Sequence, residues 1–151
     1  MSGDGLNNPA AIDTLALEAT LEDVGEDVTA IREVTDVEPV LEETGGTLTT
    51  DGNVQTIYIN NAPAGVFRPV CLKIDMTAQT VTETVVVRTY YRITPGAALI
   101  KQDEVEFAAA RDPDLINTTL EPNRYGIQVT IEKTAGTNRA YPWEVFYEVH
   151  P

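Results

Sequence analysis

The segment TVTETVVVRTYYRI, residues 80–93, indicates the fold class, because its apolar and polar side chains alternate with a period of two. Successive side chains on a β-strand point to opposite faces of the sheet. One face of this segment therefore carries Val81, Glu83, Val85, Val87, Thr89, Tyr91 and Ile93. Such alternation predicts a strand with one buried face, which is typical of an antiparallel sheet.

Five further segments alternate in the same way and are separated by turn residues. They are VQTIYIN (54–60), RPVCLKIDM (68–76), AALIKQDEVEF (97–107), YGIQVTIEK (125–133) and AYPWEVFYEV (140–149). One face of the last segment carries Tyr141, Trp143, Val145, Tyr147 and Val149. Six alternating strands at short spacing predict a mainly β fold, either an antiparallel β-sandwich or a jelly-roll-like barrel.

Two connections between these segments carry their own predictions. TAGTN, residues 134–138, is expected to be a hairpin between the last two strands, with Gly136 at positive φ. ARDPDLINTTLEPNR, residues 110–124, is the longest irregular piece. We expect it to cross from one sheet to the other.

The N-terminal part has helical periodicity instead. Apolar residues follow one another at steps of 4, 3, 4 and 3 in a seam of two heptads, made of Leu17, Leu21, Val24, Val28 and Ile31. Gly25 and a β-branched second half disfavour a long helix, and Pro39 ends it, so we expect a short, broken amphipathic helix within residues 11–38. The glycine pair of EETGGTLTTDGN marks the predicted boundary between an acidic arm, residues 1–46, and a β-sandwich domain, residues 47–151.

The net charge of −14 is concentrated in the predicted arm, which holds 12 of the 24 acidic residues and one basic residue. Like charges repel, so neither nucleic acid nor a membrane is expected as a partner. An acid-rich composition with only three lysines is typical of proteins from a high-salt cytoplasm, where molar salt shortens the Debye length to roughly 3 Å. An ordinary acidic protein of a mesophile is the alternative. Residues 1–11 resemble no signal peptide, and no apolar run approaches the roughly 20 residues of a membrane span.

Residue counts argue against nucleophilic catalysis and against cofactors. The single serine, Ser2, and the single histidine, His150, stand at opposite ends of the sequence, which disfavours a serine triad. Cys71 is the only cysteine and lies in an alternating strand, where a buried or half-buried thiol is the ordinary role. We therefore predict no enzyme, no catalytic residue and no cofactor.

Carboxylates are plentiful enough to leave two further possibilities open. A glycosidase pair among Asp103, Glu104 and Glu106 is less expected than a solvated strand face. The segment from Asp112 to Asn117 offers oxygen ligands for a divalent cation, but it lacks the glycine and the bidentate glutamate of an EF-hand loop. A turn is favoured there, and no metal ligand is predicted.

Side chains of the strand at residues 80–93 also predict an interface. Arg88, Tyr90 and Arg92 stand at alternate positions and line one face, while Tyr91 enters the other. This row is suited to contact acidic groups of another subunit, including an acidic arm, although a solvated sheet face is the simpler expectation. An alternative function is a soluble binding module that recognises carbohydrate or another surface ligand on an aromatic platform of Trp143, Tyr141 or Tyr90.

TETVVVRTYYRI, EPNRYGIQVTIEK and NRAYPWEVFYEV, together with the preceding arm, resemble in layout the small β-sandwich structural proteins of virions. The resemblance is to decoration or accessory proteins on the heads and tails of tailed viruses, and the acidic composition points to viruses of halophilic archaea. It implies a non-enzymatic protein on the capsid or tail surface, assembled in the host cytoplasm. The implied partners are copies of itself, with a trimer favoured, and other virion structural proteins.

Overall fold

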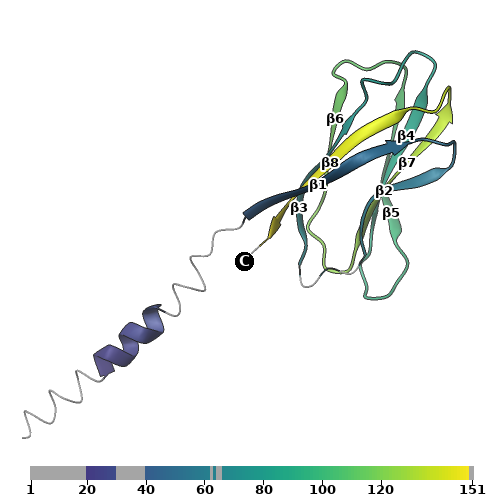
Figure 1. Cartoon of the computed structure of the whole chain (residues 1–151). Coiled ribbons are helices and arrows are strands. Elements are labelled where there is room, and N and C mark those ends of the chain that lie inside the picture. The colour runs from purple at the N-terminus through teal and green to yellow at the C-terminus, as the bar shows by residue number, and fades with distance from the viewer. Residues whose placement is uncertain (1–19, 30–39, 62, 64–65, 150–151) are drawn as a thin grey trace, which may run out of the picture. The chain divides into compact units, whose positions relative to one another are not determined.

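The computed structural model describes residues 20–29, 40–61, 63 and 66–149. The chain divides into two compact units, one of residues 1–38 with Pro151 and one of residues Pro39–His150, called the body below. Within the first unit, residues 20–29 form an α-helix (Figure 1). The helical prediction for residues 11–19 and 30–38 falls outside the described residues.

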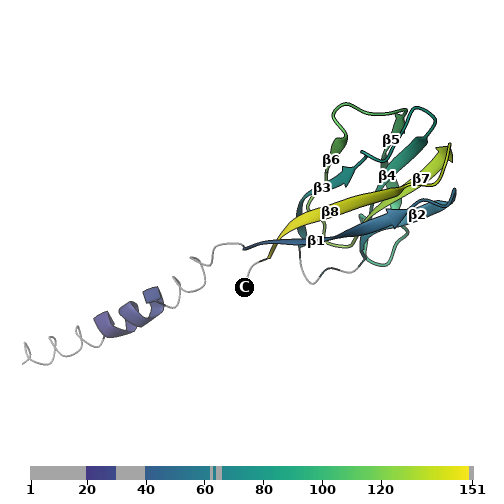
Figure 2. The ribbon, with the colours of Figure 1, turned by 45° about the horizontal axis from the view of Figure 1, so that its top comes forward.

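The body is built from two four-stranded antiparallel sheets, with the strand orders β1-β8-β3-β6 and β2-β7-β4-β5. The strands are β1 (Val40–Thr49), β2 (Val54–Asn60), β3 (Arg68–Asp75), β4 (Thr84–Tyr91), β5 (Ile100–Ala108), β6 (Leu115–Thr119), β7 (Ile127–Ala135) and β8 (Ala140–Val149). Figures 1 and 2 show the sheets as two layers. The predicted mainly β sandwich is confirmed, and nearly every connection crosses between the layers, as in a jelly roll.

The hydrophobic core fills the space between the sheets. Its fully buried apolar side chains include Leu72, Ile74, Met76, Val85, Ile127, Val129, Ile131, Tyr141 and Val145. The predicted inward face of β4 is confirmed for Val85, Val87 and Thr89, which are all buried. Val81 and Ile93 are exposed instead, because β4 begins at Thr84 and ends at Tyr91.

The predicted boundary at residue 46 falls inside β1, and the body begins at Pro39 instead. Gly45 and Gly46 lie opposite Glu144 and Trp143 of β8. A Cβ on Gly45 would lie 2.6 Å from the carbonyl oxygen of Trp143, and a Cβ on Gly46 would lie 3.6 Å from its ring. The glycine pair therefore permits a close approach of two paired strands and does not form a linker.

The predictions for the connections are confirmed only in part. The hairpin predicted between the last two strands is wrong, because β7 and β8 belong to different sheets. Gly136 nevertheless has the predicted positive φ, 83°. The crossing predicted for the segment 110–124 holds only in part: the segment enters the other sheet at β6, which pairs with β3, but then returns, because the flanking strands β5 and β7 belong to one sheet.

Candidate interaction surfaces

The helix of residues 20–29 exposes part of the predicted apolar seam. Leu21, Val24 and Val28 are exposed by 62%, 51% and 48%, and their spacing places them on one helix face. Leu17 and Ile31 lie outside the described residues. Acidic residues occupy positions 22, 23, 26 and 27 between the seam residues. Within the described part of the chain, no helix is long and apolar enough to cross a bilayer.

Arg88 lies on the outward face of its sheet and is bound by carboxylates from both neighbouring strands. Its Nε donates to Glu104 on β5, and its Nη1 donates to Glu132 on β7. The bonds to Glu104 and then Glu132 raise the pKa of the Arg88 guanidinium, and the bond from Arg88 lowers the pKa of Glu104. The charge of Arg88 is therefore balanced within its own sheet.

Tyr90 and Arg92, the other two residues of the predicted row, are also positioned by the body itself. Arg92 follows the last residue of β4 and donates to the carbonyl oxygen of Asn61 at 3.0 Å and to its Oδ1 at 2.7 Å. Tyr90 is half-buried where the register of β4 against β5 shifts. Arg88 and Tyr90 thus lie on β4 and Arg92 directly after it, but both arginines already have partners. The acidic-arm interface for this row stays a prediction.

Two of the three aromatic residues proposed as a carbohydrate platform point into the sandwich. Tyr141 is only 1% exposed. Trp143 is half-buried and packs against the core, with its ring centroid 6.4 Å from that of Tyr58. A sugar-stacking ring must present its face to solvent. The structure therefore argues against Tyr141 and Trp143 as a binding platform.

The buried hydroxyl of Tyr141 provides a test of its inward orientation. Its hydroxyl is buried without a hydrogen-bond partner among the described residues, and burial raises the pKa of Tyr141. An unsatisfied buried hydroxyl costs about 1–3 kcal/mol. We therefore expect Tyr141→Phe to leave the free energy of unfolding unchanged or raise it by up to about 1 kcal/mol in urea titrations. Tyr147→Phe is the control, because the Tyr147 hydroxyl donates to Glu42 at 3.1 Å; a larger loss in Tyr141→Phe than in this control would contradict the expectation.

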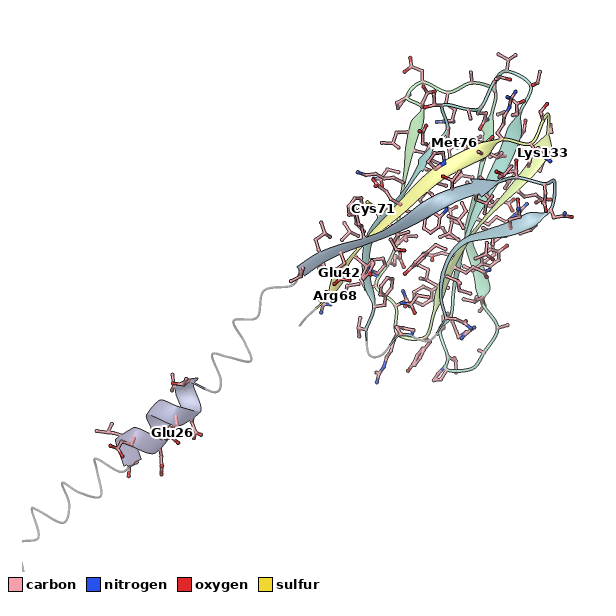
Figure 3. The ribbon with its side chains drawn as sticks, viewed as in Figure 1. Glu26, Glu42, Arg68, Cys71, Met76 and Lys133 are labelled. Carbon is pink, nitrogen blue, oxygen red and sulfur yellow. The ribbon has the colours of Figure 1, made fainter. Side chains whose placement is uncertain are left out.

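The candidate residues for chemistry are dispersed. Cys71 lies on β3 and is half-buried, as predicted (Figure 3), and His150 lies outside the described residues. Asp112 precedes a cis proline, and Asn117 belongs to β6, so the segment between them is a turn followed by a strand. In the residues that the structure describes, no group of three or more His, Cys, Asp or Glu side chains is placed to hold a metal ion.

Glu83 is a fully buried carboxylate that ties loops together at one end of the body. It accepts hydrogen bonds from the backbone N–H and hydroxyl of Thr80, from the hydroxyl of Thr82 and from Nη2 of Arg139 at 3.1 Å. The backbone N–H of Arg139 in turn donates to Thr50 Oγ1 at 3.1 Å. Several hydrogen bonds together lower the pKa of Glu83 to about 2, and the bond from the Thr80 hydroxyl has the largest effect. These contacts make Glu83 a structural residue.

A groove of about 620 Å³ runs between β5 and β6, which are edge strands of different sheets. Its apolar lining consists of Val105, Phe107, Pro113, Leu115 and Ile116, and threonines of β6 add hydroxyl groups. No pattern in the sequence indicates this groove, because its walls come from strands that do not pair with each other.

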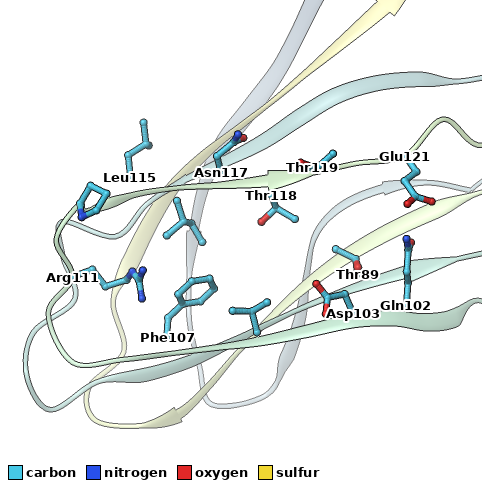
Figure 4. A pocket seen from close by; sticks show the side chains of 13 residues that line it. Thr89, Gln102, Asp103, Phe107, Arg111, Leu115, Asn117, Thr118, Thr119 and Glu121 are labelled. Carbon is cyan, nitrogen blue, oxygen red and sulfur yellow. The ribbon is translucent and has the colours of Figure 1, made fainter.

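Charged side chains lie at both ends of the groove. Figure 4 shows Arg111 near Phe107 at one end, and Gln102, Asp103 and Glu121 at the other. The Cζ atom of Arg111 lies 4.6 Å from the centroid of the Phe107 ring. Its Nε is buried and has no hydrogen-bond partner among the described residues. Arg111 is therefore a positioned cation with unused donor capacity.

No protein-family model and no curated protein sequence matches the chain. Among solved structures, it is similar to a chain of the Bacillus endospore appendages, described as disulfide-linked pili, with 15% identity, a TM-score of 0.44, and coverage of 74% of this chain and 88% of that chain. It is also similar to a chain of the infectious bursal disease virus Gx strain (14% identity, TM-score 0.41) and to one of the VP2 subviral particle of that virus (11%, 0.40). Each viral match covers 75% of this chain and 33% of the viral chain, so the chain spans about a third of their length.

Proposed function

We propose that the protein is a non-enzymatic structural subunit of a virion, which assembles as a symmetric oligomer and stabilises or projects from the particle. The exposed seam of Leu21, Val24 and Val28 on an acidic helix is the observation that supports this proposal. Apolar area stabilises a protein by about 25 cal/mol per Å² only when it is removed from water. A helix in a unit separate from the β core is suited to bury that area against other copies, with a trimer favoured.

The charge of the chain supports the more specific form of the proposal, a head decoration or accessory protein of a tailed virus that infects halophilic archaea. Residues 1–38 hold ten acidic residues and one basic residue. Identical arms of this charge repel one another when the Debye length is about 10 Å, at roughly 0.1 M salt, and much less at about 1 M, where it is roughly 3 Å. The subunit would join other virion structural proteins on the capsid or tail surface after assembly in the host cytoplasm.

Molar mass measured by light scattering at about 0.1 M and about 1 M salt tests the proposal. We expect a shift from monomer to a defined oligomer at the higher salt. The double variant Leu21→Asn/Val28→Asn should stay monomeric at both concentrations, because it removes apolar area from the seam. Glu22→Gln/Glu26→Gln is the matched control on the acidic positions of the same helix, and it should assemble at lower salt than the wild type.

Enrichment of the protein in purified particles is the second measurement. The proposal would be contradicted if the protein is a monodisperse monomer at both salt concentrations and never enriches in particles. If the double variant Leu21→Asn/Val28→Asn forms an oligomer of the same molar mass as the wild type, the helix is not the contact between copies.

A further inference from the structure

Charge is distributed unequally along the groove between β5 and β6. At one end Arg111 stacks on Phe107 and, among the described residues, has no ion-pair partner. At the other end lie the carboxylates of Asp103 and Glu121 (Figure 4). A complementary occupant should therefore carry an anion at the Arg111 end and a cation at the opposite end.

The two strands beside the groove differ as sheet edges. β6, with the sequence LINTT, has no charged residue and no proline, whereas β5 carries one lysine and three carboxylates. Charged residues on an edge strand oppose the addition of another strand. The free edge of β6 is therefore the one suited to accept an extended segment by β-augmentation.

The segment IREVTDV, residues 31–37, has the complementary pattern. Arg32, Val34 and Asp36 stand at every second position, so an extended conformation places them on one face. Arg32 and Asp36 are four residues apart, which is about 13 Å along a strand and matches the length of β6. Their opposite charges correspond to the two ends of the groove, and Val34 corresponds to its apolar middle.

We propose that the groove of one copy binds residues 31–37 of a second copy as a strand antiparallel to β6. In this arrangement Asp36 pairs with Arg111, and Arg32 faces the carboxylates at the other end. The inference rests on the proposed function, because it requires copies of the chain to assemble. It adds the place where the arm of each copy binds.

The arm of the same chain is too short to reach this position. The loop before Arg111 is hydrogen-bonded to Glu83, which belongs to the network that includes Thr50. Arg111 therefore lies at the Thr50 end of the body, whereas Val40 begins β1 at the opposite end. The ten residues of β1 span about 30 Å, and the four residues from Asp36 to Val40 reach at most about 14 Å.

Charge exchange between the two copies tests the proposed pair. At the lowest salt at which the wild type assembles, Arg111→Asp and Asp36→Arg should each weaken self-association by about tenfold. The double variant should recover most of the affinity, because the pair is restored with reversed sign. Arg124→Asp is the matched control: Arg124 also stacks on an aromatic ring, Tyr125, but lies outside the groove lining, so its replacement should change little.

Intermolecular disulfide trapping gives a second readout that does not depend on affinity. In a Cys71→Ala background, a copy with Val34→Cys is mixed with a differently tagged copy with Thr118→Cys, whose side chain lines the groove. A mixed disulfide dimer is expected. Lys73→Cys, on the outward face of β3, replaces Thr118→Cys in the control and should give none.

The outcomes separate this inference from the proposed function. If the wild type assembles but neither charge exchange nor trapping responds, the groove is not the binding place, and the proposed function stands. If one chain with both Val34→Cys and Thr118→Cys closes an internal disulfide, the occupant is its own arm and the inference falls. If the wild type remains monomeric at every salt concentration, the inference falls, and the proposed function fails with it when the protein also never enriches in particles.

Discussion

Replacement of Gly136 by alanine is expected to lower the free energy of unfolding by about 2–5 kcal/mol. Gly136 has a φ of 83°, at which a residue with a Cβ is strained. That Cβ would also lie 2.6 Å from the carbonyl oxygen of Thr82 and 2.7 Å from the Cα of Glu83. Both are backbone atoms, so the turn between β3 and β4 would have to move. Urea titration followed by the fluorescence of Trp143 measures the loss.

Gly96→Ala is the matched control for this prediction. Gly96 also has a positive φ, 71°, but a Cβ there would meet nothing within 4 Å. Only the backbone strain remains, and a loss of about 1–2 kcal/mol is expected. Equal losses in the two variants would show that the close contact between a Cβ at position 136 and the turn does not contribute to the loss of stability.

Gly136 also shows which parts of the fold the sequence could reveal. Its positive φ follows from local turn chemistry, which a short stretch of sequence specifies. The partner of each strand does not follow locally, because alternation determines the faces of a strand and not the sheet that it joins. TAGTN therefore gave the correct backbone conformation at Gly136, whereas the predicted hairpin was wrong.

The two strands absent from the prediction, β1 and β6, are both sheet edges. β1 contains Gly45 and Gly46, which weaken the strand signal. β6 is five residues long and stands among turn-forming residues. Both segments become strands by pairing with β8 and β3, a tertiary effect that intrinsic propensity does not report.

The candidate surfaces likewise include features that a local sequence pattern reveals and features that only the fold brings together. The seam of the helix was visible in the sequence, because a period of 3.6 residues is a local pattern. The two carboxylates that bind Arg88 were not visible, because Glu104 and Glu132 come from neighbouring strands whose register was unknown. Arg111 became distinctive only when the fold placed its guanidinium on Phe107 in a groove.

Removal of the Glu83 carboxylate is the other change for which we expect a large effect. Glu83→Ala would leave the donors of Thr80 and Arg139 without their buried acceptor and would detach loops from one another. We expect the melting temperature at pH 7 to fall by roughly 10 °C or more, measured by circular dichroism. Glu106→Ala is the control, because Glu106 is an exposed carboxylate on β5, and its replacement should change the melting temperature little.

The acid dependence of stability provides a specific readout for Glu83. Its pKa is about 2 in the folded protein, below the ordinary 4.5, so protons bind the unfolded chain more readily. The stabilisation is therefore complete above about pH 5 and is lost as the pH falls towards 2. Glu83→Gln lacks this step, and its melting temperature should fall less steeply over that range than those of the wild type and Glu106→Gln. Parallel curves for Glu83→Gln and the wild type would mean that the folded body does not hold Glu83 ionised.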